Sequence, residues 1–445
     1  MSVKDDALKF AINAHDGQVR KSEKDKPMII HPYSVGKILE EYGCDDNVVA
    51  AGYLHDVIED TKYTYDDINK IFGKDIADLV MSASEPDKSL SWEERKQYMI
   101  DQTRDLPLRN KYILIADKIN NLEDLYLLNE KNGKKDFSNF NRGEESQKWY
   151  YHNIYQSLIN NEDENLPIFK RLKKDIDLVF DKQENKISAY YVGNEEYYKK
   201  VKELDARLTE LQNLKKIITL DKPYVIESTG TPRTGKTSTL EDLSDFYKKG
   251  GFKVNYVKEF TTSKKYKEEL QEKYNKLSSN EKYLKILEEI EKELKSAIKT
   301  NADIIIIDRS INDRQVWNYL NYINGNFDEE TYTKLRDKYQ KISQKLIDYL
   351  LVTKTNANEA IKRDYLAHAS IRPRTFLTEE NVNKYNNSLE SVDNLLKNSV
   401  NTYFKMDTTN TNLADERLKV IESTAKDLRK KYINKFNEDI KIRKK

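Results

Sequence analysis

Residues 50–60 read Ala50-Ala51-Gly52-Tyr53-Leu54-His55-Asp56-Val57-Ile58-Glu59-Asp60. Apolar residues recur here at intervals of three and four, the period of a helix with one buried face, and His55 and Asp56 interrupt the apolar run. Similar spacing extends from Ala7 to about Ser157 and predicts an all-α domain. Buried polar groups need partners, and imidazole beside carboxylate is a suitable ligand pair for a divalent cation.

Two further polar residues interrupt apolar runs in this region. His31 lies in Ile29-Ile30-His31-Pro32, and Asp117 follows Ile113-Leu114-Ile115-Ala116. One buried histidine is more often a hydrogen-bonded core residue than a ligand, whereas four such residues together favour a metal site. Glu59 and Asp60 lie one helical turn after His55 and Asp56, so they could place a second carboxylate pair beside an attacking water.

These residues belong to a series of stretches that resembles the HD-domain phosphohydrolases, and among them the alarmone hydrolase domains of the RelA/SpoT type. The resemblance covers roughly residues 3–157 in matching order and spacing. The matching stretches are Ala14 to Ser22, Ile30 to Pro32, Leu54 to Thr61, Phe72 to Ala77 and Ala116 to Leu122. The loop after Ala83 resembles that of the small stand-alone hydrolases more than that of the long bifunctional enzymes, and no (p)ppGpp synthetase region follows.

The resemblance implies a Mn²⁺ ion with four ligands: His31, His55, Asp56 and Asp117. It implies that Glu59 and Asp60 orient or deprotonate the attacking water, and that four residues contact the substrate: Arg20, Lys21, Ser22 and Asn121. The implied reaction removes the 3′-pyrophosphate of (p)ppGpp or a related nucleotide. Two imidazoles and two carboxylates would also accept Fe²⁺, Co²⁺ or Zn²⁺, and other HD enzymes cut different phosphate esters.

A second group of candidate functional residues begins where the sequence pattern changes from helical to β-type. The β-type run Tyr224-Val225-Ile226 precedes Gly230-Thr231-Pro232-Arg233-Thr234-Gly235-Lys236-Thr237-Ser238, and a helical pattern follows. This stretch fits Gly-x-x-x-x-Gly-Lys-Ser/Thr in the strand–loop–helix context where backbone N–H groups cradle phosphates. We expect Lys236 to reach the β/γ oxygens of ATP or GTP and Thr237 to ligate Mg²⁺.

Two other predicted strands end in residues suited to phosphoryl transfer. The apolar run Ile304 to Ile307 ends in Asp308-Arg309-Ser310, where a Walker B carboxylate belongs, and the strand Phe252 to Val257 is followed by Glu259. Glu259 with Asp308-Arg309-Ser310 resembles the deoxynucleoside and thymidylate kinase group. This resemblance implies that Glu259 activates an acceptor hydroxyl and that Arg309 contacts phosphate. A plain surface glutamate is the alternative at position 259.

Three arginines farther along could close over the phosphates as a lid: Arg363, Arg372 and Arg374. Unpaired surface arginines would give the same pattern. We predict a multidomain chain with an all-α HD domain (1–160), a helical connector (161–220) and an α/β P-loop NTPase or kinase-like domain with a parallel sheet (221–445). A last strand is expected at Thr402 to Met406.

Composition limits the partners. The chain has 445 residues, 77 basic and 76 acidic, so its net charge of +1 supplies no global field for nucleic acid or an anionic membrane. The single cysteine, Cys44, indicates a reducing compartment, and the absence of an apolar signal or membrane segment makes the cytoplasm the expected location. The expected partners are nucleotide substrates, and the sequence leaves the oligomeric state open.

Three functions are compatible with these sequence features. The leading one is a nucleotide enzyme with two active sites, an HD phosphohydrolase joined to a P-loop kinase or NTPase. In the second, the P-loop domain is a nucleotide sensor or ATPase that regulates the hydrolase. The third, an HD nuclease with an ATPase motor, predicts a basic groove that the balanced charge does not indicate.

Overall fold

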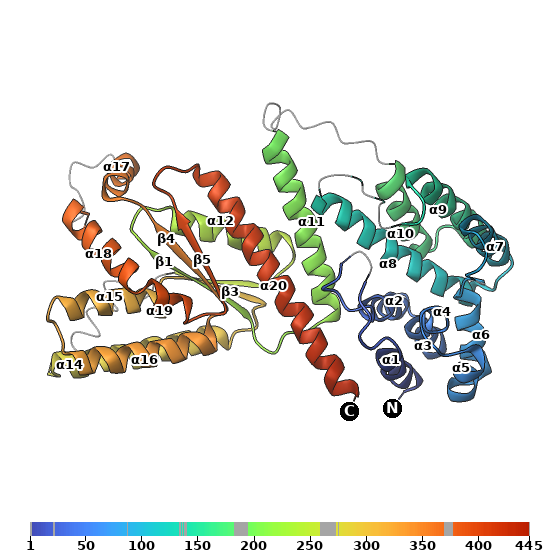
Figure 1. Ribbon diagram of the computed structural model, residues 1–445, viewed down its shortest axis with the longest axis horizontal. Helices are drawn as coiled ribbons and strands as arrows, with labels where there is room; N and C mark the ends of the chain where they lie inside the picture. The colour runs from blue at the N-terminus through green and yellow to red at the C-terminus, as the bar shows by residue number, and fades with distance from the viewer. Residues whose placement is uncertain are drawn as a thin grey trace. The chain divides into compact units, whose positions relative to one another are not determined.

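The computed structural model describes residues 2–20, 23–86, 88–132, 135, 137, 140–181, 195–258, 273–274, 276–368 and 377–444. Contacts divide the chain into two compact units, one of Met1–Ile218 with Tyr432–Lys445 and one of Thr219–Lys431. The first unit is helical, and the second contains a five-stranded parallel sheet (Figure 1). The predicted fold class is confirmed. Among the described residues, no helix combines the length and apolar character needed to cross a membrane.

The helices of the first unit follow the apolar period of the sequence. They are α1 (Val3–Ala14), α2 (Ile30–Glu41), α3 (Asp46–Leu54), α4 (Val57–Asp60), α5 (Tyr65–Phe72), α6 (Lys74–Ala83), α7 (Trp92–Arg104), α8 (Leu108–Asn132), α9 (Glu144–Leu158), α10 (Pro167–Ile176), the π-helix η1 (Asp177–Asp181) and α11 (Glu195–Ile217). Capping boxes begin several of them, as Ser91 does with Glu94 at the start of α7.

Two glycines let α2 and α3 approach each other closely. A Cβ atom on Gly36 would lie 2.2 Å from Cε1 of Tyr53, and one on Gly52 would lie 2.4 Å from Cδ1 of Leu39. Real Cβ atoms do not approach other atoms so closely, so a larger residue at either position would have to displace Tyr53 or Leu39 from this contact. Because His31 begins α2 and His55 follows α3, this approach brings the two imidazoles together.

The second unit is a parallel sheet with strand order β2-β3-β1-β4-β5. Its strands are β1 (Tyr224–Gly230), β2 (Val254–Val257), β3 (Ile304–Asp308), β4 (Tyr349–Lys354) and β5 (Thr402–Asp407). Its helices are α12 (Lys236–Lys249), α14 (Ser279–Ile298), α15 (Ile311–Ile323), α16 (Glu329–Leu346), α17 (Ala357–His368), α18 (Glu379–Ser391), α19 (Asp393–Lys397) and the first part of α20 (Leu413–Lys444). The strand β4 is not predicted from the sequence, because it is a short apolar run directly after a helix, which periodicity cannot assign.

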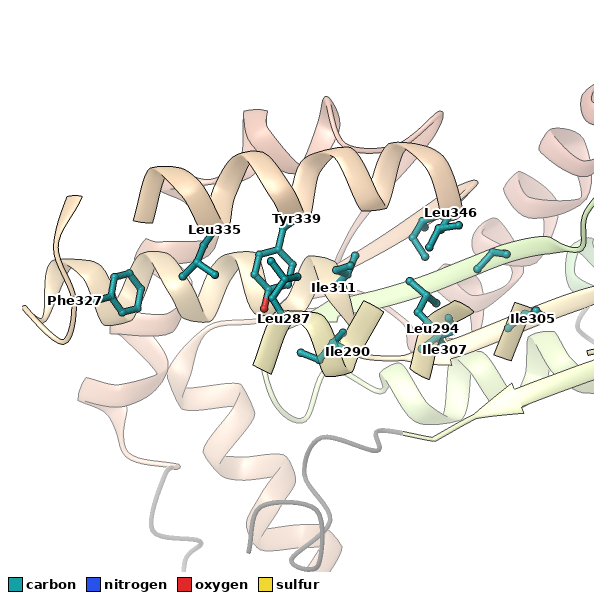
Figure 2. Close-up of a cluster of buried hydrophobic side chains, with 12 residues drawn as sticks. Leu287, Ile290, Leu294, Ile305, Ile307, Ile311, Phe327, Leu335, Tyr339 and Leu346 are labelled. Atoms are coloured by element: carbon teal, nitrogen blue, oxygen red, sulfur yellow. The ribbon is translucent and has the colours of Figure 1, made fainter. Parts of the chain in front are cut away.

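A large buried apolar cluster packs against the sheet. Ile305 and Ile307 of β3 lie in one buried cluster with Leu287, Ile290 and Leu294 of α14 (Figure 2). The helix α14 belongs to a long charged stretch, 264–299, and it is amphipathic, with its apolar side packed on the sheet. The core holds β1 and β3 parallel, so that both end beside the phosphate-binding loop.

Candidate metal centre and phosphate-binding loop

Three helices bring the predicted ligands to one point. His31 lies in the first turn of α2, His55 at the C-terminal end of α3 and Asp117 in the middle of α8, and all three side chains are buried. Their ligand atoms lie within 4.8 Å of one another, as in a metal site. The two Nε2 atoms are 3.2 Å apart, and Oδ1 of Asp117 is 3.2 Å from that of His31 and 3.8 Å from that of His55.

The other ring nitrogens already have partners. Nδ1 of His55 donates to the carbonyl of Gly52 at 2.9 Å, and Nδ1 of His31 donates to Oδ1 of Asn120 at 2.6 Å. Because both acceptors fix the ring proton on Nδ1, both Nε2 atoms present lone pairs to the same point. Two facing lone pairs repel each other unless a proton or a metal ion lies between them, so this donor set fits a bound cation.

Carboxylates make the same point attractive to positive charge. Oδ1 of Asp56 lies 3.1 Å from Nε2 of His55, and Oδ2 lies 3.5 Å from Nε2 of His31. Burial opposes protonation of His55, but Asp56 and Asp117 outweigh it and raise its pKa to about 9. Burial likewise opposes ionisation of Asp117, yet Lys118 and the two histidines hold its pKa well below the usual range. The centre thus stabilises a cation among ionised acids.

The predicted proton-handling pair lies one turn farther along the chain, in α4. Oε1 of Glu59 accepts a hydrogen bond of 2.6 Å from the backbone N–H of Glu85, and burial raises the pKa of Glu59 to about 7. Asp60 is more exposed, and its Oδ1 accepts from Nζ of Lys88 at 3.1 Å. A carboxyl group with a pKa near neutrality can both take up and release a proton at physiological pH.

Two of the four predicted substrate contacts lie beside the metal centre. Nδ2 of Asn121 donates to Oδ1 of Asp117 at 2.5 Å, and Nη2 of Arg20 donates to Oδ1 of Asn121 at 3.2 Å and to Oδ2 of Asp124 at 3.0 Å. The structure therefore brings Arg20 and Asn121 to the centre. Lys21 and Ser22 lie outside the described residues.

Three supporting residues on α8 are not among those predicted from the sequence. Asn120 orients His31, Lys118 donates to Oδ2 of Asp117 at 2.6 Å, and Asp124 holds both Arg20 and Lys26. Helical spacing signals two of them, because Asn120 and Asp124, three and seven residues after Asp117, lie on its side of α8, whereas Lys118 directly follows Asp117. That spacing could have been used once Asp117 had been identified.

The second unit forms the predicted phosphate-binding loop. Gly230 and Gly235 have φ values of 130° and 83°, and Gly235 precedes the first residue of α12. A Cβ atom on Gly230 would lie 1.8 Å from the carbonyl oxygen of Thr353, so only glycine fits there. Nζ of Lys236 donates to the carbonyls of Gly230 and Thr231 at 3.1 and 2.6 Å, inside the loop.

Asp308, at the end of β3, contacts the first turn of α12. Oγ1 of Thr237 donates to Oδ2 of Asp308 at 2.7 Å, so the predicted Mg²⁺ ligand and the predicted Walker B carboxylate are in contact. Arg309 has a left-handed backbone, with φ of 63°, and its Nη2 donates to the carbonyl of Gly230 at 3.1 Å while Nη1 is 3.2 Å from Oδ1 of Asp313. The strained conformation therefore turns the guanidinium toward the loop.

Only one of the three lid arginines can be placed. Nη1 of Arg363 donates to the carbonyl of Arg233 at 3.4 Å, and Nη2 donates to the carbonyl of Thr408 at 2.6 Å. Arg363 thus lies against the loop, and it also donates to Oε1 of Glu359 and to Oγ1 of Thr408, both at 2.9 Å. Arg372 and Arg374, like the proposed base Glu259, lie outside the described residues.

A fully buried acid in β1, Glu227, is not among the residues predicted from the sequence. Its Oε1 accepts from the backbone N–H groups of Ser310 and Asn312 at 2.9 and 2.8 Å, and thereby caps the N-terminus of α15. The signal was a lone acid directly after the apolar run of β1. Its role is structural, because it fixes the turn that carries Arg309.

Comparisons with known proteins agree with the first of these sites. The HD domain family matches residues 7–139. The chain is 38% identical over 122 residues to guanosine-3′,5′-bis(diphosphate) 3′-pyrophosphohydrolase MESH1 of Drosophila melanogaster, a match that covers 27% of this chain and 68% of that protein. It is 38% identical over 125 residues to the bifunctional (p)ppGpp synthase/hydrolase SpoT of Escherichia coli K12, covering 27% of this chain and 17% of SpoT.

The C-terminal part is similar in structure to a kinase. The structure of deoxyadenosine kinase from M. mycoides matches 45% of this chain and 99% of that chain, with 19% sequence identity and a TM-score of 0.33. The sequence match to the HD proteins is the more specific of these findings, and it coincides with the buried His and Asp centre. Through its helical N-terminal unit, the chain belongs to the HD-domain family of MESH1-type guanosine-3′,5′-bis(diphosphate) 3′-pyrophosphohydrolases.

Proposed function

We propose that the first unit is a Mn²⁺-dependent phosphohydrolase that removes the 3′-pyrophosphate of (p)ppGpp or a related nucleotide. The observation that carries the proposal is the pair of Nε2 atoms, 3.2 Å apart, that face each other and Asp117 while both Nδ1 atoms are already engaged. His31, His55, Asp56 and Asp117 would hold the metal. Such an ion, when bound, lowers the pKa of water from near 16 to about 7–9 and offsets phosphate charge.

The chain's own residues supply the remaining steps. Glu59 and Asp60 orient the attacking water and take up its proton, for which the neutral-range pKa of Glu59 is suited. Arg20 binds phosphate oxygens or the guanine base, because its guanidinium is already held beside the centre by Asn121 and Asp124. Asn121, beside Asp117, would contact the ribose.

The test is to incubate the purified chain with Mn²⁺ and a panel of nucleotides that includes (p)ppGpp, and to follow released pyrophosphate. We expect pyrophosphate together with GDP or GTP. Pyrophosphate or phosphate from another nucleotide alone would reject the alarmone as substrate and leave a phosphohydrolase. Release from none of them would reject the hydrolase proposal altogether.

The hydrolase should gain activity as the pH rises through neutrality. Burial raises the pKa of Glu59 to about 7, so this carboxyl is largely protonated below that pH and cannot accept the proton of the attacking water. We expect kcat to increase between about pH 6 and about pH 8 with an apparent pKa near 7. Steady-state kinetics at fixed Mn²⁺ concentration measure it. A kcat that does not change with pH over this interval would contradict a base role for Glu59.

We propose further that the second unit binds ATP or GTP with Mg²⁺ and transfers or hydrolyses the γ-phosphoryl group. The contact between Thr237 and Asp308, with Lys236 inside the loop, supports this, since these are the groups that hold Mg²⁺ and phosphate oxygens in P-loop proteins. Glu259 as the base for an acceptor hydroxyl, and Arg372 and Arg374 as lid residues, remain predictions. If there is no acceptor, the unit acts as a nucleotide sensor or ATPase that regulates the hydrolase.

A further inference from the structure

Glu85 lies in the loop between α6 and α7 and contacts the proposed catalytic centre through its main chain. Its backbone N–H donates to Oε1 of Glu59 at 2.6 Å. Lys88 in the same loop donates from Nζ to the carbonyl oxygen of Glu59 at 2.7 Å and to Oδ1 of Asp60 at 3.1 Å. The loop therefore holds both carboxylates of the proton-handling pair.

The side chain of Glu85 anchors this loop to a neighbouring helix. Its Oε2 accepts from Nη1 of Arg95 at 2.7 Å, and its Oε1 accepts from Nζ of Lys96, both on α7. The ammonium of Lys96 also lies 4.5 Å from the ring centroid of Tyr150 on α9. All three charged side chains are at most 17% exposed, so solvent weakens these contacts little.

We propose that Glu85 is a positioning residue for hydrolysis: its ion pairs with α7 hold the loop so that the backbone N–H of Glu85 orients the carboxylate of Glu59. This inference rests on the proposed function of the first unit. A backbone donor aimed at a carboxylate oxygen fixes its direction and favours its ionised form. Without the anchor, the loop could turn that donor away, and Glu59 would lose its orientation.

If Glu85 acted only through its negative charge, its replacement would shift the pH dependence of kcat in the direction opposite to that expected from a positioning role. Among the described residues, the charged groups near Glu59 include Asp56, Asp60 and Glu85, and Lys88 donates to its backbone carbonyl. The negative charge of Glu85 raises the pKa of Glu59, whereas its backbone N–H lowers it. Removing only the charge would therefore lower the pKa of Glu59 and move the acid limb of the pH profile to lower pH. Loosening the loop would remove the backbone donor, raise this pKa, move the acid limb to higher pH and lower kcat.

The experiment compares Glu85→Gln with the unaltered full-length chain in the Mn²⁺-dependent pyrophosphate assay. We expect kcat to fall about tenfold or more with little change in KM, as for lost outer partners of a catalytic site, and the acid limb to move to higher pH. Glu85→Asp, which keeps the charge, should retain more activity. The matched control is Glu93→Gln, which breaks an ion pair with Arg142 at an exposed position and should leave kcat and the pH profile unchanged.

Each outcome decides between the two explanations. An unchanged kcat, or an acid limb that moves downward in Glu85→Gln, overturns the positioning role while the hydrolase stands. If thermal melting shows that this variant does not fold, Lys96→Gln opens the same ion pair from α7, and an unchanged kcat there also overturns it. If the unaltered chain releases no pyrophosphate, the proposed function fails first and the inference fails with it.

Discussion

His55→Gln is expected to abolish the pyrophosphohydrolase activity and to remove most of the Mn²⁺ affinity. His55 supplies one of the two Nε2 atoms that face the centre, and glutamine has no ring nitrogen to place there. Loss of an outer partner of a metal ligand alone costs roughly 10–100-fold, so loss of a ligand should cost at least about a hundredfold in metal affinity. Titration calorimetry with Mn²⁺ and the pyrophosphate assay measure the two effects.

The matched control is His152→Gln. His152 is 37% exposed, lies in the same helical unit and has its Nε2 3.0 Å from Oδ2 of Asp181. It should leave Mn²⁺ binding and hydrolysis unchanged. Full Mn²⁺ affinity in His55→Gln, with an intact fold by circular dichroism, would show that the His and Asp centre is a hydrogen-bonded core cluster and not a metal site.

Lys236→Met is expected to weaken nucleotide binding by the second unit and to stop phosphoryl transfer. Nζ of Lys236 lies inside the phosphate-binding loop, where it donates to two backbone carbonyls that phosphate oxygens would replace as partners. A hydrogen bond to a charged group contributes about 1.5–3 kcal/mol, which corresponds to a roughly 10- to 100-fold loss of ATP or GTP affinity. Equilibrium binding of a fluorescent ATP or GTP analogue measures it.

Lys248→Met, at an exposed position in the last turn of α12, serves as the control because it changes the same residue type on the same helix. Undiminished nucleotide affinity in Lys236→Met would contradict the loop as a phosphate site. The same variant distinguishes between the two proposed roles of the second unit, a second enzyme and a nucleotide sensor. A lost phosphorylated product with normal pyrophosphate release indicates a second enzyme, whereas an altered hydrolase rate without any transferase product indicates a sensor.

The site residues could be identified from the sequence because each stands out from the residues next to it in the chain. A histidine or an acid in an apolar helical run is costly unless it has a partner, so His31, His55 and Asp117 stood out without any knowledge of their neighbours. The phosphate-binding loop was equally readable, since its glycines, Lys236 and Thr237 act within one strand–loop–helix unit. The strand Tyr349–Lys354 was not, because a short apolar run fits a strand and a buried helix equally well.

The sequence by itself therefore determined the residue types, their order and the two classes of phosphate chemistry that they favour. Only the tertiary structure decided which nitrogen of each imidazole faces the centre, because that depends on acceptors from other turns and helices, Gly52 and Asn120. It also brought Glu85 to Glu59, 26 positions away along the chain. Such contacts arise from how helices pack, and packing depends on the shapes of many side chains at once, which no local pattern encodes.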